Sequence, residues 1–313
     1  MLQYIVILLD DTSTSFCHYQ VVKTESSLIS IDTLKQAIRF AMIENLTIQF
    51  VYPNYELPND YNNVIESIDH IKIKPFTAQC NDADVVVLDN LELKDFNLNS
   101  NVIYVIRNST DYIISHQNEI KKMLESGARV NIVATDIEQI TDSVMESYRD
   151  FINILSDDLV SLYAKGLSPQ TNILTDRLLL DNMNNCGAGD STITLAPDSK
   201  FYICPAFYQE RLGNVGNLKS GVKIPNSQLY KIKYAPICSH CDAFQCKRCI
   251  WLNKKMTLEV NTPSREQCVM AHYERNASRN LLQKVRKYGD FLPGKEISEI
   301  DYLDPFDVVQ QKS

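Results

Sequence analysis

The stretch YIVILLDD, residues 4–11, decides how the first half of the chain is expected to fold. Six apolar or aromatic residues followed by two aspartates are typical of a buried strand of a parallel sheet. The run is too short to cross a membrane, and no lysine or arginine precedes it, as one would in a signal peptide. We therefore expect a cytoplasmic protein.

Strand-like and helix-like segments alternate after this first strand, which predicts an α/β fold with a parallel sheet covered by helices. Five or six strands suit an open parallel sheet or a partial (β/α) barrel, and fall short of a complete eight-fold barrel. The predicted strands are 4–9, 47–53, 70–74, 84–89, 102–108 and 129–136, and the predicted helices are 30–45, 61–68, 115–127, 142–166 and 275–289. The helix over 142–166 is expected to break near Ser156.

The pattern changes near residue 167, where turns begin to dominate and cysteines appear. This predicts a (β/α) domain over 1–170, a Cys-rich domain over 171–290 and a polar C-terminal tail over 291–313. The net charge of −8 argues against a general partner of nucleic acids or of anionic membranes.

The segment CSHCDAFQCKRC, residues 238–249, carries the strongest chemical signal. Each C-x-x-C turn can point two thiolates at one centre, and two such turns together suit a zinc site or an iron–sulfur cluster. In a reducing compartment, clustered cysteines bind metals more often than they form disulfides. Seven cysteines are too many for one ion, so two centres are expected. The predicted ligands are Cys186, Cys204, Cys238, Cys241, Cys246, Cys249 and Cys268.

Residues 186–268 resemble the SPASM domain, the C-terminal extension of radical-SAM enzymes that modify ribosomal peptides. The likeness lies in the order of the seven cysteines and in CGAGDSTITLAPDSKFYICP, residues 186–205, which has the family's β-hairpin character. It implies one auxiliary [4Fe–4S] cluster on Cys238, Cys241, Cys246 and Cys268. A second cluster would use Cys186, Cys204 and Cys249, without an evident fourth ligand. Shortened gaps within 238–249 leave this partition open, and also leave zinc as an alternative.

The front half lacks the cysteines that a radical-SAM enzyme needs for its catalytic cluster. That family places C-x3-C-x2-C on the loop after the first strand, but residues 10–20 here contain Cys17 alone. We therefore expect no cleavage of S-adenosylmethionine. The chain as a whole resembles the CXXX repeat peptide maturase family, on the segments LLDDTSTSFCHY (8–19), IENLTIQFVYPNYELP (43–58), VIESIDHIKI (64–73), ICSHCDAFQCKRCIWLNKK (237–255) and NTPSREQCVMAHYERNASR (261–279).

That resemblance implies a role in maturing a ribosomally made Cys-rich peptide, as an accessory or peptide-binding partner of a radical-SAM maturase. Two alternatives remain open: an enzyme that modifies the peptide by itself through an auxiliary cluster, and a docking protein stapled by zinc.

Other polar residues have both a functional and a structural interpretation. Asp10 and Asp11 can serve acid–base chemistry at a strand end, or cap the turn that follows. Cys17 with His18 can form a nucleophile–base pair, or be a plain part of the loop. His240 and His272 can replace a thiolate on zinc. The basic residues Lys231, Lys233, Lys247, Arg248, Lys254 and Lys255 can offset the negative charge of a thiolate-bound cluster, or form a solvated face.

Overall fold

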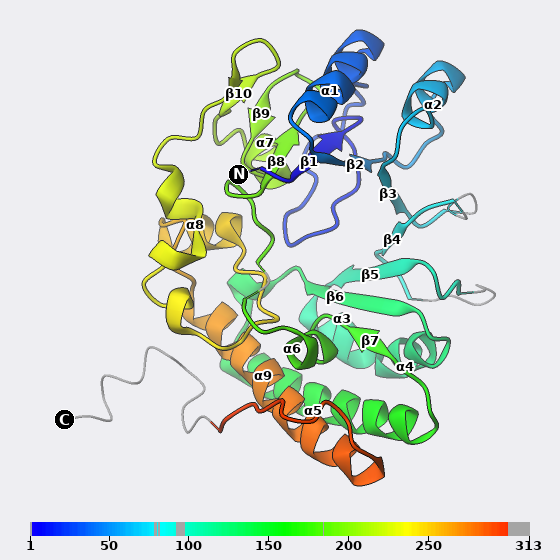
Figure 1. Ribbon diagram of the computed structural model, residues 1–313, viewed down its shortest axis with the longest axis vertical. Coiled ribbons are helices and arrows are strands. Elements are labelled where there is room, and N and C mark those ends of the chain that lie inside the picture. The colour runs from blue at the N-terminus through cyan, green and yellow to red at the C-terminus, as the bar shows by residue number, and fades with distance from the viewer. Residues whose placement is uncertain (1, 78–79, 81, 92–97, 184, 300–313) are drawn as a thin grey trace. The chain divides into compact units, whose positions relative to one another are not determined.

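A computed structural model describes residues 2–77, 80, 82–91, 98–183 and 185–299 of the chain (Figure 1). The chain divides into two compact units, and each unit is built from two separate segments. The first unit joins Met1–Leu88 to Cys186–Ala235, and the second joins Asp89–Asn185 to Pro236–Ser313. The boundaries of these two units do not coincide with the domain boundary predicted near residue 170, and that boundary stays a prediction.

The first unit contains a mostly parallel sheet with the order β4-β3-β2-β1-β8-β9. Strand β1 pairs in parallel with β2 on one side and with β8 on the other, so both of its edges are satisfied. Only the last pair, β8 with β9, is antiparallel. The strands are β1 (Tyr4–Leu8), β2 (Thr47–Val51), β3 (Ile71–Pro75), β4 (Val85–Leu88), β8 (Thr192–Leu195) and β9 (Phe201–Tyr202).

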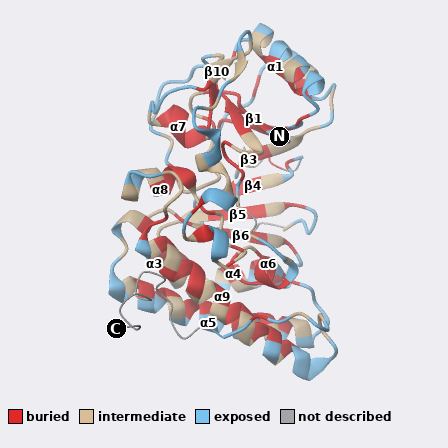
Figure 2. Ribbon diagram, turned by 60° about the vertical axis from the view of Figure 1, so that its left-hand side comes forward, coloured by how far each residue is buried: buried red, intermediate tan, exposed pale blue. Residues whose placement is uncertain are grey.

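The helices and turns of the first unit connect its strands. Ser30 caps helix α1, because its hydroxyl accepts a hydrogen bond from the backbone N–H of Thr33. One face of α1 is buried and the opposite face is exposed (Figure 2). The remaining elements here are α1 (Ile31–Ile43), α2 (Asn59–Ile65), α7 (Pro205–Gln209), the hairpin β10 (Gly216–Asn217) with β11 (Gly221–Val222), and 3₁₀ turns at Ser227–Tyr230 and Ile232–Tyr234.

The second unit contains parallel strands in the order β7-β6-β5 and a layer of helices. Its strands are β5 (Ile103–Asn108), β6 (Arg129–Ala134) and β7 (Gln170–Thr171). Its α-helices are α3 (Thr110–Ser115), α4 (Gln117–Glu125), α5 (Asp142–Ala164), α6 (Thr175–Leu179), α8 (Ile250–Thr257) and α9 (Arg265–Val285), with 3₁₀ turns at Ile137–Gln139, Cys238–His240 and Arg286–Tyr288.

The long helices α5 and α9 pack along each other, and their facing sides are buried (Figure 2). The predicted break of α5 near Ser156 is wrong. Ser156 is buried against α9 and its hydroxyl donates to the carbonyl of Ala277, so tertiary packing carries the helix through this position.

Helix α9 begins at Arg265, ten residues earlier than the predicted start at 275. A capping box fixes this start, because the Ser264 hydroxyl accepts from the backbone N–H of Gln267 and the Gln267 side chain accepts from the backbone N–H of Ser264. The earlier start places Cys268 in the first turns of a helix.

The C-terminal tail is described as far as Glu299, and its predicted remainder over 300–313 lies outside the described residues. The guanidinium of Arg286 donates to the carbonyls of Phe291, Leu292 and Lys295, and Lys295 forms an ion pair with Asp181. These bonds hold the described part of the tail on the second unit.

The α/β fold class with a parallel sheet is confirmed, and the six strands predicted within the first 140 residues all occur. Among the residues described here, none of the helices is both long and apolar enough to cross a membrane.

Candidate metal centre

A cavity of about 330 Å³ in the second unit brings together cysteines that are up to thirty residues apart in the sequence. Cys238, Cys241, Cys246 and Cys268 all line it. These are the four that the SPASM resemblance assigns to one auxiliary cluster. Three come from the 3₁₀ turn and the loop after it, and the fourth comes from α9.

Backbone N–H groups in this loop are directed at the sulfur atoms. The N–H of Ala243 lies 3.4 Å from the Sγ of Cys241, and the N–H of Arg248 lies 3.4 Å from the Sγ of Cys246. In each bond the N–H belongs to the residue two positions after the cysteine, so one tight turn supplies both the thiol and the donor that bonds to it. Such donors stabilise sulfur that carries negative charge, and in iron–sulfur proteins they tune the reduction potential.

Three buried guanidinium groups lie in this part of the unit. Arg248, which lines the cavity, is 2% exposed, while Arg275 and Arg177 are 1% and 3% exposed. Arg275 binds Asp242 in a bidentate pair, with Nε–Oδ1 and Nη2–Oδ2 distances of 2.8 and 2.6 Å. Arg177 approaches the same carboxylate at 3.3 Å. Two buried positive charges therefore share one negative charge beside Cys241, which favours an anionic occupant.

Burial favours the neutral form of three of these thiols, those of Cys238, Cys241 and Cys246. Burial raises the pKa of Cys238 to about 11 and that of Cys246 to about 12, and it also raises the pKa of Cys241. The charge of Arg248 acts in the opposite direction and lowers the pKa of Cys238. Metal binding needs thiolates, so a metal or cluster that binds here displaces protons.

Two predicted alternative ligands also line the cavity. His240 is exposed, whereas His272 is buried and its Nε2 lies 3.6 Å from the Sγ of Cys241. Among the described residues, no three side chains of His, Cys, Asp or Glu lie close enough together to hold a single metal ion. The ligand assignment stays a prediction for this reason.

Cys186 and Cys204 lie in the first unit, where Cys186 precedes β8 and Cys204 follows β9. Burial is the largest cause that raises the pKa of Cys204 to about 12, and the charge of the nearby Cys186 adds to this effect. The turn after Cys186 requires glycine, because Gly189 has a φ of +76° and a Cβ there would lie 2.6 Å from the ring of Tyr230. Tyr230 in turn lies near Cys204, whose charge adds to burial in raising the pKa of the tyrosine.

Cys249, the third predicted ligand of that second cluster, is the N-cap residue of α8 and belongs to the second unit. The set formed by Cys186, Cys204 and Cys249 therefore stays a prediction.

Asp10, the first aspartate of the loop after β1, has a structural role. Asp10 is fully buried, and its carboxylate accepts hydrogen bonds from the N–H and hydroxyl of Thr12, from Ser26 and from Tyr55, at 2.6–2.9 Å. Burial alone would raise its pKa, but these bonds outweigh that effect and hold the pKa below its usual value. The turn-capping interpretation of Asp10 is thus confirmed.

Asp11 fastens the same loop to helix α7. Its carboxylate accepts a hydrogen bond from the Tyr208 hydroxyl and pairs with Lys23 at 3.2 Å, and the Gln209 amide donates to its carbonyl. Carboxylate–hydroxyl contacts therefore hold the loop over residues 10–20 in place. Cys17 is the one cysteine within it.

Sequence reasoning missed the part played by Arg177, Asp242 and Arg275. Arg275 was predicted to begin a helix, but it lies within α9, where its guanidinium forms the ion pair with Asp242. A signal was available, because Cys268, His272 and Arg275 are spaced i, i+4, i+7 and so share one helix face.

Comparison with known proteins rests on structure alone, since no family model and no curated protein matches the sequence. The chain is similar to anSMEcpe with bound AdoMet, with a TM-score of 0.63 and 13% identity over 90% of this chain and 99% of that one. Structures of anSMEcpe with AdoMet and the Cp18Cys peptide, or with AdoMet and the Kp18Cys peptide, match over the same shares with TM-scores of 0.63 and 0.62. At this identity the likeness establishes only that the chain shares the α/β fold of anSMEcpe.

Proposed function

We propose that this chain carries iron–sulfur clusters and acts in the maturation of a ribosomally made, Cys-rich CXXX repeat peptide. In this role it is an accessory or peptide-binding partner of a radical-SAM maturase. The observation that carries the metal part of the proposal is one cavity lined by four cysteines, beside two guanidinium groups that share one carboxylate.

The residues around the cavity fit a thiolate-bound [4Fe–4S] cluster. Cys238, Cys241, Cys246 and Cys268 would hold it, and the buried arginines would balance its negative charge. A bound cluster supplies electron transfer, or a coordination position for a substrate sulfur where an iron has no protein ligand. The chain's own contribution is to aim N–H donors at sulfur and to fix the charge around the site.

The loop after β1 supports an accessory role rather than cleavage of S-adenosylmethionine. It provides a single thiol where three are needed, and its carboxylates are engaged in holding the loop closed. The peptide part of the proposal is supported by the fold, which is shared with a protein whose structures hold bound peptides.

The first test is a metal and sulfide analysis of protein purified without oxygen, together with its visible spectrum. We expect about seven to eight irons per chain, matching sulfide and broad absorbance near about 400 nm, the values for two cubane clusters. One or two zinc ions without colour would overturn the cluster proposal and leave the zinc-stapled docking protein.

The second test separates the accessory role from a stand-alone enzyme. The purified, cluster-loaded chain is incubated with a CXXX repeat peptide and a reductant, with and without the radical-SAM maturase, and the peptide mass is followed. Modification only in the presence of the partner supports the accessory role, whereas modification by this chain alone overturns it.

A further inference from the structure

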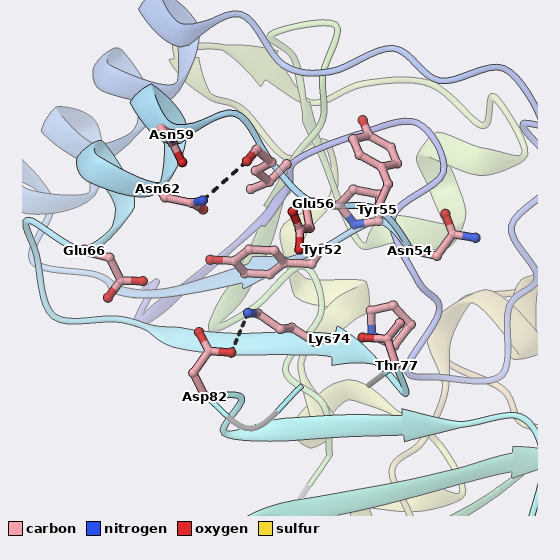
Figure 3. A pocket seen from close by; sticks show the side chains of 13 residues that line it. Tyr52, Asn54, Tyr55, Glu56, Asn59, Asn62, Glu66, Lys74, Thr77 and Asp82 are labelled. Carbon is pink, nitrogen blue, oxygen red and sulfur yellow. Dashed lines mark hydrogen bonds and ion pairs between the residues drawn. The ribbon is translucent and has the colours of Figure 1, made fainter. Parts of the chain in front are cut away.

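Charged side chains outside the cysteine cavity are paired in two different ways. In the first unit, the pairs join residues of one folded body. Lys74 lies 2.6 Å from Asp82 in a cavity of about 670 Å³, where Figure 3 marks the pair with a dashed line, and Lys72 lies 2.6 Å from Glu66. In the second unit, by contrast, arginines of α9 are paired by the tail that follows this helix.

Three arginines lie on one face of α9 and its C-cap. Arg275, Arg279 and Arg286 are spaced i, i+4, i+11, which places them within about 40° of one another around the helix axis. Arg286 donates to three backbone carbonyls of the tail, Arg279 pairs with Glu299 at 3.2 Å, and Nη2 of Arg275 lies 3.5 Å from the Ser298 hydroxyl. Figure 1 shows the tail, in red, running back along α9. We call residues 290–299 the strap and the three arginines the arginine stripe.

The strap is held mainly by contacts at the surface. It contains no helix or strand, and Ile297, 6% exposed, is its one buried residue. The carboxylates in its ion pairs are exposed, since Glu299 is 70% exposed and Asp181, the partner of Lys295, is 88% exposed. Exposed ion pairs contribute little to stability, whereas ordering the strap costs conformational entropy. We therefore expect the strap to open locally far more often than α9 unfolds.

Opening of the strap changes the charge balance of this face. Within the described part of the chain, the guanidinium groups of Arg279 and Arg286 bond to the strap alone. Arg275 keeps its bidentate pair with Asp242, which fixes one end of the stripe. The strap itself carries three carboxylates and one lysine. The closed structure thus shows the kind of chain that this face binds, which is an extended acidic segment.

We propose that the strap is a releasable cover of the arginine stripe, and that an acidic segment of the partner peptide docks there in its place. Guanidinium groups form strong, charge-assisted hydrogen bonds with carboxylates. The best-fitting segment has a branched apolar residue two positions before a carboxylate, as Ile297 and Glu299 have. Asp242 also lines the cysteine cavity, so a peptide on the stripe would lie beside the proposed cluster. The proposed function contributes only the peptide as the occupant.

The test measures binding of a fluorescein-labelled peptide, GKEISEID, to the full chain by fluorescence anisotropy. This peptide copies residues 294–301. Because the closed strap competes with the peptide, Ile297→Ala should bind it about tenfold more tightly than the unchanged chain, and Glu299→Gln about threefold more tightly. The matched control Glu296→Gln removes an exposed carboxylate of the same strap that forms no ion pair within the described residues, and should leave binding unchanged.

Two further measurements test the stripe itself. In the Ile297→Ala chain, Arg279→Gln should weaken peptide binding about tenfold, and the peptide GKEISQID should bind about tenfold more weakly than GKEISEID. Hydrogen exchange of the unchanged chain should become faster over residues 290–299 when GKEISEID is added, because the peptide displaces the strap.

Four results would overturn the inference: no binding to the Ile297→Ala chain at about 1 mM peptide, equal affinity of the two peptides, equal effects of Glu299→Gln and Glu296→Gln, or unchanged exchange of the strap. A dimer in sedimentation that the peptide dissociates would assign the stripe to the tail of a second copy, and overturn a peptide as occupant. Thermal unfolding checks that Ile297→Ala is folded, and the surface change Glu299→Gln keeps the test decisive if it is not. The assay does not depend on iron content, so its failure is distinguishable from failure of the cluster proposal.

Discussion

The loop after β1 and the cysteine cavity both gather reactive side chains, but they differ in how far these side chains satisfy one another. In the loop, the Asp10 carboxylate accepts four hydrogen bonds, and Asp11 is bonded to Tyr208 and paired with Lys23. In the cavity, four thiols face an excess of buried positive charge.

The comparison teaches that a set of polar residues indicates a binding site when its charges and hydrogen bonds do not balance. A balanced set, such as that around Asp10, stabilises the fold and offers nothing to a ligand. An unbalanced set costs free energy in the empty protein, and a complementary ligand recovers that cost.

The largest expected effect is the loss of a cluster on Cys268→Ala. Removing this thiol takes one of four ligands from the proposed site, so about four irons per chain should be lost and the protein should unfold at lower temperature. Iron analysis and thermal unfolding measure both. Cys17→Ala is the control, and its iron content should stay unchanged. Loss of a cluster from the Cys17 variant would show that the loop after β1 binds metal, which would erase the contrast between the two regions.

Asp10→Ala tests the balanced region. Four donors lose their acceptor in a buried position, so the free energy of unfolding should fall by about 3 kcal/mol while iron content stays constant. Urea unfolding measures the change, with the exposed Asp32→Asn as a control of equal charge change. A large loss of iron without a loss of stability would contradict a structural role for Asp10.

The raised pKa of Glu274 predicts that the free energy of unfolding depends on pH. Its carboxyl accepts from the Tyr148 hydroxyl at 2.7 Å and from the Gln245 amide at 3.2 Å, and burial raises its pKa from 4.5 to about 7. The folded state therefore binds this proton more tightly than the unfolded state does. The contribution of Glu274 to stability is therefore fully present below pH 4.5 and is lost as the pH rises through about 7, a change of about 3 kcal/mol.

Glu274→Gln should remove that slope, because a glutamine does not titrate. Urea unfolding between about pH 5 and about pH 8 compares the two proteins at equal iron content. An unchanged slope in the glutamine variant would assign the pH dependence to another group.

The smallest expected effect concerns the buried charge of Arg248. Arg248→Met removes a positive charge near Cys238 and should lower the reduction potential of a bound cluster by about 100 mV, since the reduced cluster carries one more negative charge. Redox titration measures the shift. Arg248→Lys keeps the charge, and Lys247→Met removes a more exposed charge from the neighbouring residue; both should shift the potential less. Equal shifts for Arg248→Met and Lys247→Met would show that burial of Arg248 does not matter.

Much of the fold was predictable, because each β-strand of the front half has a local apolar pattern and a polar boundary. The start of α9 was missed since the capping signal at Ser264 and Gln267 was not recognised, although it is present in the sequence. The continuity of α5 was missed for a different reason. Ser156 is a poor residue for a helix interior in isolation, and only its packing against α9 makes it acceptable.

The sequence by itself determined the α/β class, the order of strands and helices in the front half, and the seven cysteines as candidate ligands, since these depend on local periodicity and residue type. The family resemblance implied that Cys268 groups with Cys238, Cys241 and Cys246, but only the tertiary structure shows all four lining one cavity. It also decided that Arg177 and Arg275 share Asp242. The physical reason is that burial and charge balance depend on side chains far apart in the sequence, which only the folded chain brings together.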